Sequence, residues 1–278
     1  MLFYIFLWAS AFVPSKIGVL GSSPLWFLAV RFAVAGVVAL AFARATGARF
    51  PRGRTEWTAA VAVGLLANAV YLGCTYEALR HLASGVGAIV ASTNPLALAV
   101  VAPWLLHERL TLAKGVGLLL GFGGVVAIMY ERSGSGSAEP RDVALAFAGV
   151  LAGVASTIVF KRWCSTLDLR ALVPIQLLAS GVAVLPGALL LEGAPHALWT
   201  WQLVVSFWYV VLVMSFGASV LWFWLLARGE ASRVSAYYFL TPVFGLALAA
   251  LLLHEAVGVH DLAGLAAIAA GIALVQRG

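Results

Sequence analysis

Thr93-Asn94-Pro95, followed by His107-Glu108, decides the fold because a second copy of the pattern occurs later as Thr241-Pro242 and His254-Glu255. In both copies the step from proline to glutamate is 13 residues (108 − 95 and 255 − 242), and the copies lie 147 residues apart (242 − 95). Repetition at a fixed distance is typical of internally duplicated folds. We therefore expect two halves of similar design.

Composition places both halves in a membrane. Of 278 residues, 63% are hydrophobic and 10% are charged, whereas about a quarter of an ordinary soluble domain is charged. The apolar runs are roughly 17 to 25 residues long, enough for a helix to cross a hydrocarbon layer of about 30 Å. We predict an all-α integral membrane protein with ten transmembrane helices, at residues 2–19, 24–43, 57–79, 83–106, 112–130, 142–162, 170–191, 199–227, 232–253 and 260–276.

A polar Gly/Ser-rich stretch at residues 131–141 divides these helices into two sets of five. Such a composition is typical of a flexible linker, so the expected repeats are residues 1–130 and 142–278. Five helices per half is an odd number, so the second half enters the membrane inverted relative to the first. Inverted-topology repeats around a central cavity, with a substrate site near the bilayer midplane, are typical of secondary transporters.

The basic residues predict the orientation of the chain. With the N-terminus inside, twelve of the 17 Lys and Arg residues fall on the cytoplasmic side, as the positive-inside rule requires. We expect a multi-pass protein of the cell (inner or plasma) membrane with both termini cytoplasmic. The twelve are Arg44, Arg49, Arg52, Arg54, Arg109, Lys114, Lys161, Arg162, Arg170, Arg228, Arg233 and Arg277.

Several of these features also resemble a known family. Trp8-Ala9-Ser10-Ala11-Phe12, Arg31, and Asn94-Pro95 with His107-Glu108-Arg109-Leu110 and its repeat are similar to the drug/metabolite transporter superfamily, in its ten-helix EamA-type branch. The resemblance covers essentially the whole chain. It implies an exporter of amino acids or other metabolites, with a central cavity lined mainly by helices 1, 3, 4, 6, 8 and 9. The high aromatic content looks most like members that export aromatic amino acids.

The acidic residues argue against strong proton coupling and against catalysis. All 11 Asp and Glu residues lie at or close to a span boundary, and a charged group at the bilayer centre costs at least about 2.5–3.5 kcal/mol. No His, Asp or Glu lies deep enough to act as a base or as part of a metal cluster. We expect no catalytic residue, metal or cofactor, and no nucleic-acid partner. The partners we expect are a small-molecule substrate and the lipid bilayer, and the oligomeric state stays open.

Neutral polar residues are the candidates for substrate contact. In the third span Asn68, Tyr71 and Thr75 have the spacing i, i+3, i+7 and form one stripe. The stripe fits either a cavity wall or hydrogen bonds between helices. Further candidates are Ser156 and Thr157 in the sixth span and Ser219 and Trp222 in the eighth.

Two prolines provide the other candidate positions. Pro95 and Pro242 lack an N–H and free a carbonyl one turn earlier, which is tolerated at membrane depth beside protein or a water-filled cavity. Together with Asn94, Tyr237, Tyr238 and Thr241 they form a neutral site suited to an ammonium and an aromatic ring. Alternatively, both prolines only bend packed helices.

Arg31 lies about 10 Å inside the second span. It either binds a substrate carboxylate or has a structural role with its charge drawn towards the membrane surface. Our first hypothesis is an alternating-access carrier or exporter of small amphipathic metabolites, aromatic or hydrophobic amino acids first, by facilitated or weakly coupled transport. The alternative is a transporter of anionic metabolites such as sugar phosphates, with Arg31, Lys16 and Lys161 as ligands.

Overall fold

The computed structural model describes residues 1–78, 81–82, 84–132, 139–244 and 258–278. Over these residues the chain is largely helical, and the β pairing found there is an isolated bridge between Ser22 and Ala197. Seven of the described helices are long and apolar enough to cross a membrane, and a shorter apolar helical stretch covers Ile89–Leu105. The predicted all-α membrane fold is confirmed. The count of ten helices and the two repeats stay predictions.

The helices pack into two compact units. Unit 1 comprises Met1–Ala9, Glu77–Val154 and Gly229–Gly278, and unit 2 comprises Ser10–Tyr76 and Ala155–Arg228. Each unit takes helices from both sides of the expected linker at residues 131–141. The compact units therefore interleave the two sequence repeats, and the division of the chain into repeats at that linker stays a prediction.

Unit 1 contains the residues of the duplicated proline motif. Its fourth span, expected as one helix over residues 83–106, is two helices separated at residues 92 and 93. Pro95 explains the break, since its ring excludes the carbonyl of residue 91 from the helical ladder. The helices of unit 1 are α1 (Leu2–Ser10), α6 (Ser84–Ala91), α7 (Asn94–Leu105), α8 (Leu112–Arg132), the first part of α9 (Pro140–Val159), α13 (Ala231–Ala236), the 3-10 segment η5 (Tyr237–Leu240) and α15 (Val259–Arg277).

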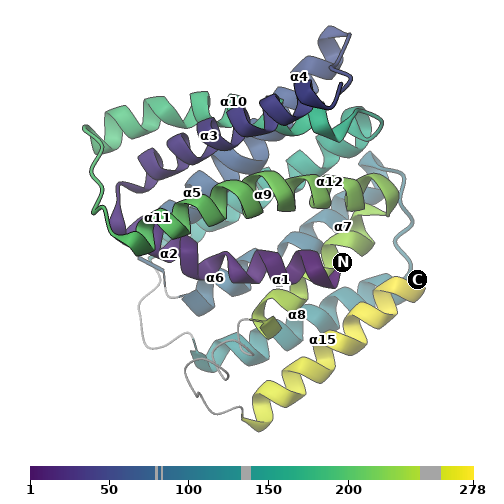
Figure 1. Ribbon diagram of the computed structural model, residues 1–278. Helices are drawn as coiled ribbons and strands as arrows, with labels where there is room; N and C mark the ends of the chain where they lie inside the picture. Colours follow the sequence, from purple (N-terminus) through teal and green to yellow (C-terminus); the bar gives the residue numbers. More distant parts are fainter. Residues whose placement is uncertain (79–80, 83, 133–138, 245–257) are drawn as a thin grey trace. The chain divides into compact units, whose positions relative to one another are not determined.

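Helices α8 and α15 lie side by side (Figure 1), and glycines bring their backbones together. A Cβ added at Gly117 would lie 2.6 Å from the carbonyl oxygen of Gly271, and one at Gly124 would lie 2.6 Å from that of Gly264. The pairing shows that the two helices run antiparallel. It is also reciprocal under the sequence repeat, because 117 + 147 = 264 and 124 + 147 = 271.

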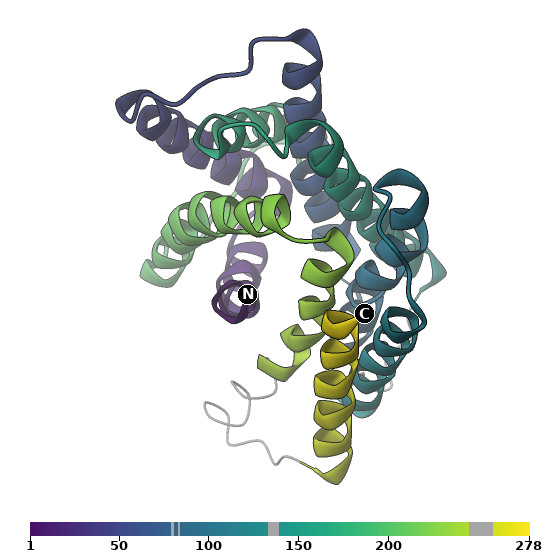
Figure 2. The same cartoon turned by 90° about the vertical axis from the view of Figure 1, so that its right-hand side faces the viewer.

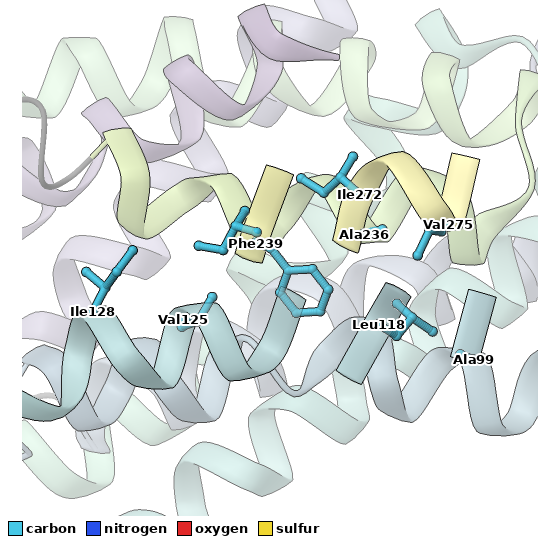
Figure 3. Close-up of a cluster of buried hydrophobic side chains, with 9 residues drawn as sticks. Ala99, Leu118, Val125, Ile128, Ala236, Phe239, Ile272 and Val275 are labelled. Carbon is cyan, nitrogen blue, oxygen red and sulfur yellow. The ribbon is translucent and has the colours of Figure 1, made fainter. Parts of the chain in front are cut away.

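A buried apolar cluster completes this contact (Figure 3). The ring of Phe239, from η5, points into the layer formed by α8 residues such as Leu118 and Val125, and Ile272 of α15 lies on the other side. Phe239 is fully buried, and a Cβ at Gly121 would collide with its ring. In Figure 2 α13 and η5 lie beside the yellow α15. Phe239 thus holds η5 against the α8–α15 pair.

Unit 2 is built from long helices with wider turns inserted in them. Two of its π-helical segments lie in the third and eighth spans at positions related by the sequence repeat, since 65 + 147 = 212 and 70 + 147 = 217 fall inside Tyr209–Ala218. π-helical turns are rare and often occur at functional sites. The elements of unit 2 are α2 (Phe12–Gly21), α3 (Pro24–Ala45), α4 (Arg54–Gly64), η1 (Leu65–Val70), α5 (Tyr71–Ala78), η2 (Phe160–Cys164), α10 (Leu169–Gly187), η3 (Ala188–Glu192), α11 (Trp201–Trp208), η4 (Tyr209–Ala218) and α12 (Ser219–Arg228), with the last part of α9.

The first span differs from the expected continuous helix over residues 2–19. It is interrupted at Ala11, between α1 and α2. Pro14 is the cause, because a proline removes the hydrogen bond to the carbonyl four residues earlier, here that of Ser10. The helical register restarts with the hydrogen bond from Ser15 N to the carbonyl of Ala11, at 2.9 Å.

Helices α3 and α10 form the closest pair of unit 2 (Figure 1). A Cβ at Gly36 would lie 2.7 Å from the Leu178 side chain, and one at Gly181 would lie 3.1 Å from the backbone nitrogen of Ala33. The carboxylate of Glu192 accepts hydrogen bonds from the N–H groups of Leu25 and Trp26. These N–H groups belong to the first turn of α3, where backbone N–H groups have no hydrogen-bond partner within their own helix. Small residues and this cap together hold α3 against α10.

Candidate functional site

The predicted residues fall in both units, and each unit is described separately. Unit 1 contains four of them, Asn94, Tyr237, Tyr238 and Thr241, along with both prolines. Unit 2 contains the other seven, Asn68, Tyr71, Thr75, Ser156, Thr157, Ser219 and Trp222.

In unit 1, the break between α6 and α7 places Asn94 at the first position of α7. Thr93 closes the preceding turn by donating from Oγ1 to the carbonyl of Val90 at 2.6 Å, and the carbonyl of Thr93 accepts from Ala97 N at 2.9 Å. Asn94 is half-buried, and its side-chain amide makes no hydrogen bond with a described residue. This amide keeps its donors and acceptor for another partner.

Three aromatic rings gather where the ninth helix narrows into η5. The hydroxyls of Tyr4 and Tyr238 lie 3.0 Å apart in a hydrogen bond. The Trp8 ring stacks against Tyr4 at 6.3 Å between centroids and meets Tyr238 edge-to-face at 5.8 Å. Both geometries suit aromatic quadrupoles. Tyr4 is buried while Trp8 and Tyr238 are half-buried, so the cluster keeps accessible aromatic surface.

Thr241 and Tyr237 flank this cluster with different surroundings. The hydroxyl oxygen of Thr241 is buried and is one of two buried side-chain N or O atoms, within the described part of the chain, that lack a hydrogen-bond partner. Buried polar atoms are rarely left unpaired. Tyr237, in contrast, packs against the apolar cluster around Phe239. Thr241 therefore has the free hydrogen-bonding group and Tyr237 contributes packing.

Charged side chains stabilise the end of unit 1 at which α13 begins. The Glu108 carboxylate accepts hydrogen bonds from the N–H groups of Ala231 and Ser232 and from the Ser232 hydroxyl, at 2.5, 3.1 and 2.6 Å. Beside it, the buried Lys114 donates to Glu230 at 2.6 Å. A carboxylate is favoured at a helix N-terminus by the unpaired N–H groups and by the helix dipole. The motif glutamate thus caps α13, where the ninth helix begins.

In unit 2, the polar stripe of the third span meets α10. Asn68 is buried and donates from Nδ2 to Gln176 Oε1 at 2.7 Å and to Ser180 Oγ at 3.2 Å. Ser180 donates in turn to the carbonyl of Gly64 at 3.0 Å. Thr75 bonds back to the carbonyl of Tyr71 in its own helix. The Asn68 amide donors are used within the protein, which favours hydrogen bonding between helices at this position.

The remaining predicted residues of unit 2 also have protein partners. Ser156 and Thr157 are buried, and Ser156 donates to the carbonyl of Val63 at 3.2 Å. Ser219 makes a long contact of 3.5 Å with the carbonyl of Met214. Trp222 is half-buried. Substrate contact by these residues stays a prediction.

Arg31 differs from all of these residues because it carries a buried charge. Only 6% of its surface is exposed. Its Nε donates to Ser215 Oγ at 2.7 Å, and its Nη1 donates to the Tyr76 hydroxyl at 3.3 Å. The guanidinium carbon lies 5.5 Å from the centroid of the Phe32 ring. All of these partners are neutral.

Outside the membrane-spanning segments, Asp168 caps the N-terminus of α10. Hydrogen bonding from the Arg170 side chain, joined by the backbone N–H groups of Arg49 and Arg170, lowers the pKa of Asp168 below its usual value. A lowered folded-state pKa adds stability above the unfolded-state pKa, and that stability is lost as the pH falls through the folded-state value.

We therefore expect Asp168→Asn, which keeps an N-cap side chain but removes its charge, to lower the free energy of unfolding by up to about 1 kcal/mol at pH 7, because the ion pair with Arg170 is lost. The deficit should shrink as the pH falls below the usual carboxyl pKa, because the carboxyl group of the unfolded chain then binds a proton, and it should vanish once the pH is below the lowered pKa of the folded state. Thermal melts of both proteins in detergent at pH 7 and at pH 3 measure this. An equal deficit at both values would contradict the role given to the charge.

Sequence reasoning missed several of the residues described above. Tyr4 and Trp8 are spaced i, i+4 on α1, and Gln176 and Ser180 have the same spacing on α10, which places each pair on one helix face. That spacing was the available signal. No local signal pairs Ser215 with Arg31. Among the described residues, no three His, Cys, Asp or Glu side chains come close enough to hold a metal ion.

Comparison with known proteins places the chain in a family. The model of the EamA-like transporter family matches residues 1–130 and 141–277. The uncharacterized transporter YvbV of Bacillus subtilis is 28% identical over 277 residues, covering 99% of this chain and 89% of that protein. The uncharacterized inner membrane transporter YedA of Escherichia coli K12 is 26% identical, with 98% and 88% covered. A protein of known crystal structure, 20% identical, has the same fold, with a TM-score of 0.83 over 99% of this chain and 94% of its own. This chain belongs to the EamA-like transporter family.

Proposed function

We propose that this membrane transporter is an alternating-access carrier that exports small amphipathic metabolites, with aromatic or hydrophobic amino acids as the cargo. The observation that carries the proposal is the cluster of Tyr4, Trp8 and Tyr238 at the 3-10 segment of the ninth helix. The carrier sits in the cell membrane with both termini cytoplasmic, as the distribution of basic residues favours.

The cluster suits a zwitterion with an apolar or aromatic side chain. Aromatic faces attract an ammonium group with about 0.5–2 kcal/mol per contact, and edge-to-face packing adds about 0.5–1.5 kcal/mol for an aromatic cargo. The unpaired amide of Asn94 and the unpaired hydroxyl of Thr241, both in unit 1, supply neutral hydrogen-bonding groups. A neutral site of this kind can bind a zwitterion without a co-transported ion.

Weak ion coupling is supported by where the acids lie. Asp142 and Asp261, the buried acids among the described residues, occupy the first turns of α9 and α15. A proton carrier would need a titratable group at membrane depth. We therefore infer that the cargo moves down its own gradient or with weak coupling.

Alternating access is supported by the signs of inverted duplication. The reciprocal glycine contacts of α8 and α15 are what a two-fold axis in the membrane plane produces between equivalent helices. The family model also matches two segments, residues 1–130 and 141–277, which lie within a residue of the repeats expected from sequence. Inverted repeats of this kind are typical of carriers that rock around a central site.

Counterflow in proteoliposomes tests the cargo. Vesicles loaded with unlabelled L-phenylalanine should accumulate labelled L-phenylalanine without an imposed proton gradient. Trp8→Ala should reduce the initial rate at least tenfold, because stacking on the indole is lost. Trp201→Ala, at a residue 71% exposed, serves as the control and should retain the rate. Equal loss in both variants, or uptake that requires a proton gradient, would contradict the proposal.

The alternative cargo, a sugar phosphate held by several cations, is less well supported. Lys161 donates to the carbonyl of Leu226, whereas Arg31 donates to Ser215. These partners are 11 residues apart (226 − 215) on the continuous helix Trp201–Arg228, or about 16 Å along its axis. One phosphoryl group cannot reach two cations placed so far apart. The side chain of the third cation, Lys16, lies outside the described residues.

A further inference from the structure

We propose that Arg31 is the anchor for a single carboxylate of the cargo, and that Ser215 and Tyr76 are the residues that position its guanidinium. This inference rests on the proposed transport function and adds a specificity-determining residue to it. It names the charged group that a cargo must carry in order to be recognised by unit 2.

The first step is that the charge of Arg31 has no counter-charge. The side chain is 94% buried (100 − 6) within unit 2, and among the described residues it forms no ion pair. Placing a charge at membrane depth costs at least about 2.5–3.5 kcal/mol, and buried charges in proteins are normally paired. Two neutral hydroxyls do not offset that cost. The residue therefore has a use that requires its charge to be free.

The second step is that one nitrogen of the guanidinium has no partner. Nε donates to Ser215 and Nη1 donates to Tyr76, while Nη2 makes no hydrogen bond with a described residue. The buried side-chain atoms that lack a hydrogen-bond partner, within the described residues, are Arg233 Nε and Thr241 Oγ1. Nη2 is not one of them, so it retains accessible surface. This is the edge of the guanidinium at which we place the carboxylate.

The third step is that the two hydroxyls orient the guanidinium. Ser215 belongs to the π-helical segment η4, and Tyr76 belongs to α5. They fix two of the three nitrogens from two different helices, which leaves Nη2 and the second N–H of Nη1 for a planar, bidentate contact. Guanidinium and carboxylate match in that geometry. Because both partners are neutral, the positive charge remains available to the ligand.

The last step concerns the kind of anion. One guanidinium with no second cation in contact compensates one negative charge, which fits a monocarboxylate better than a doubly charged phosphate ester. Lys161 donates to the carbonyl of Leu226, which lies about 16 Å further along the eighth helix than Ser215. We therefore assign the carboxylate of an amino acid to this site, and make phosphate binding an outcome of the test.

The test measures binding to the purified full-length protein of two probes that differ only in this group. L-Phenylalanine carries the carboxylate, and L-phenylalaninamide replaces it with a neutral amide. Arg31→Gln should weaken phenylalanine binding at least tenfold and change phenylalaninamide binding less than twofold. Ser215→Ala and Tyr76→Phe should each weaken phenylalanine binding several-fold with the same selectivity. Arg228→Gln removes an arginine that stacks on Trp224 at 4.0 Å and should change neither.

Other outcomes decide against the inference. Equal weakening for both probes would show a structural role for Arg31. Selective loss of glucose 6-phosphate binding in Arg31→Gln would show a phosphate site instead. If Arg31→Gln does not fold, the same probes on Ser215→Ala, Tyr76→Phe and Arg31→Lys still decide, because a structural role predicts no preference between the probes.

Failure of the cargo proposal gives a separate result. A wild-type protein that binds neither phenylalanine nor its amide would overturn the aromatic cargo. The carboxylate site would still be supported if lactate bound to the wild type and not to Arg31→Gln, and it would be overturned if lactate bound equally to both.

Discussion

Gly64→Ala should lower the free energy of unfolding by about 3 kcal/mol, at the upper end of what overpacking costs. A Cβ at this position would collide with the carbonyl oxygen, carbonyl carbon and Cα of Gln176. All three are backbone atoms of α10, so no side-chain rotation relieves the clash. The substitution would also push α4 away from the hydrogen bond that Ser180 donates to the Gly64 carbonyl.

Gly73→Ala is the matched control because it adds the same methyl group to the same membrane span. A Cβ at Gly73 would meet no atom within 4 Å, and alanine is favoured over glycine in helices by up to about 1 kcal/mol. The control should be as stable as the wild type or slightly more stable. Thermal melts of both variants in one detergent measure the difference. Equal melting temperatures for the two variants would show that α4 and α10 do not pack as described.

Glu108→Ala should lower the free energy of unfolding by about 2 kcal/mol. The substitution removes three hydrogen bonds to a carboxylate at the start of α13. Bonds to charged groups contribute about 1.5–3 kcal/mol each when buried, and the half-buried setting of Glu108 reduces the total. The N–H groups of Ala231 and Ser232 would be left without their partner, so their hydrogen exchange should accelerate.

Glu56→Ala provides the comparison for this prediction. Glu56 accepts one hydrogen bond, from the N–H of Arg52 four residues away, at 2.9 Å in an exposed setting. Its loss should cost less than about 1 kcal/mol. Hydrogen–deuterium exchange of both variants, followed by mass spectrometry, reports the ends of the two helices separately. Unchanged exchange at Ala231 and Ser232 in Glu108→Ala would contradict the cap.

The helices and their breaks were largely predictable from sequence because they depend on local chemistry. Apolar runs of membrane length predict spans, and Pro95 predicts the end of α6. Pro14 carried the same signal for the first span, where a continuous helix was expected. The repeated motif drew attention to Glu108, but the sequence did not show which groups its carboxylate binds. The capped N–H groups at Ala231 and Ser232 lie more than a hundred residues further along the chain.

The packing partners were not predictable because they depend on contacts far apart in the sequence. From sequence, Asn68 fits either the wall of a cavity or a hydrogen bond between helices. Only the position of Gln176 on α10 favours the hydrogen bond between helices. The π-helical segments shift the helical phase in the third and eighth spans, so a stripe drawn with 3.6 residues per turn does not hold across them. Arg31 was visible as an unusual residue, whereas its neutral partners Ser215 and Tyr76 required the fold.

The reciprocal contact between Gly117 and Gly271, and between Gly124 and Gly264, has a consequence for the history of the chain. A helix surface that packs against an inverted copy of itself can form a contact between two molecules of the same polypeptide. A polypeptide of half this length, inserted into the bilayer in both directions, would already form the α8–α15 contact as a homodimer. Fusion of two such copies would then fix the opposite orientations within one molecule and free each copy to diverge.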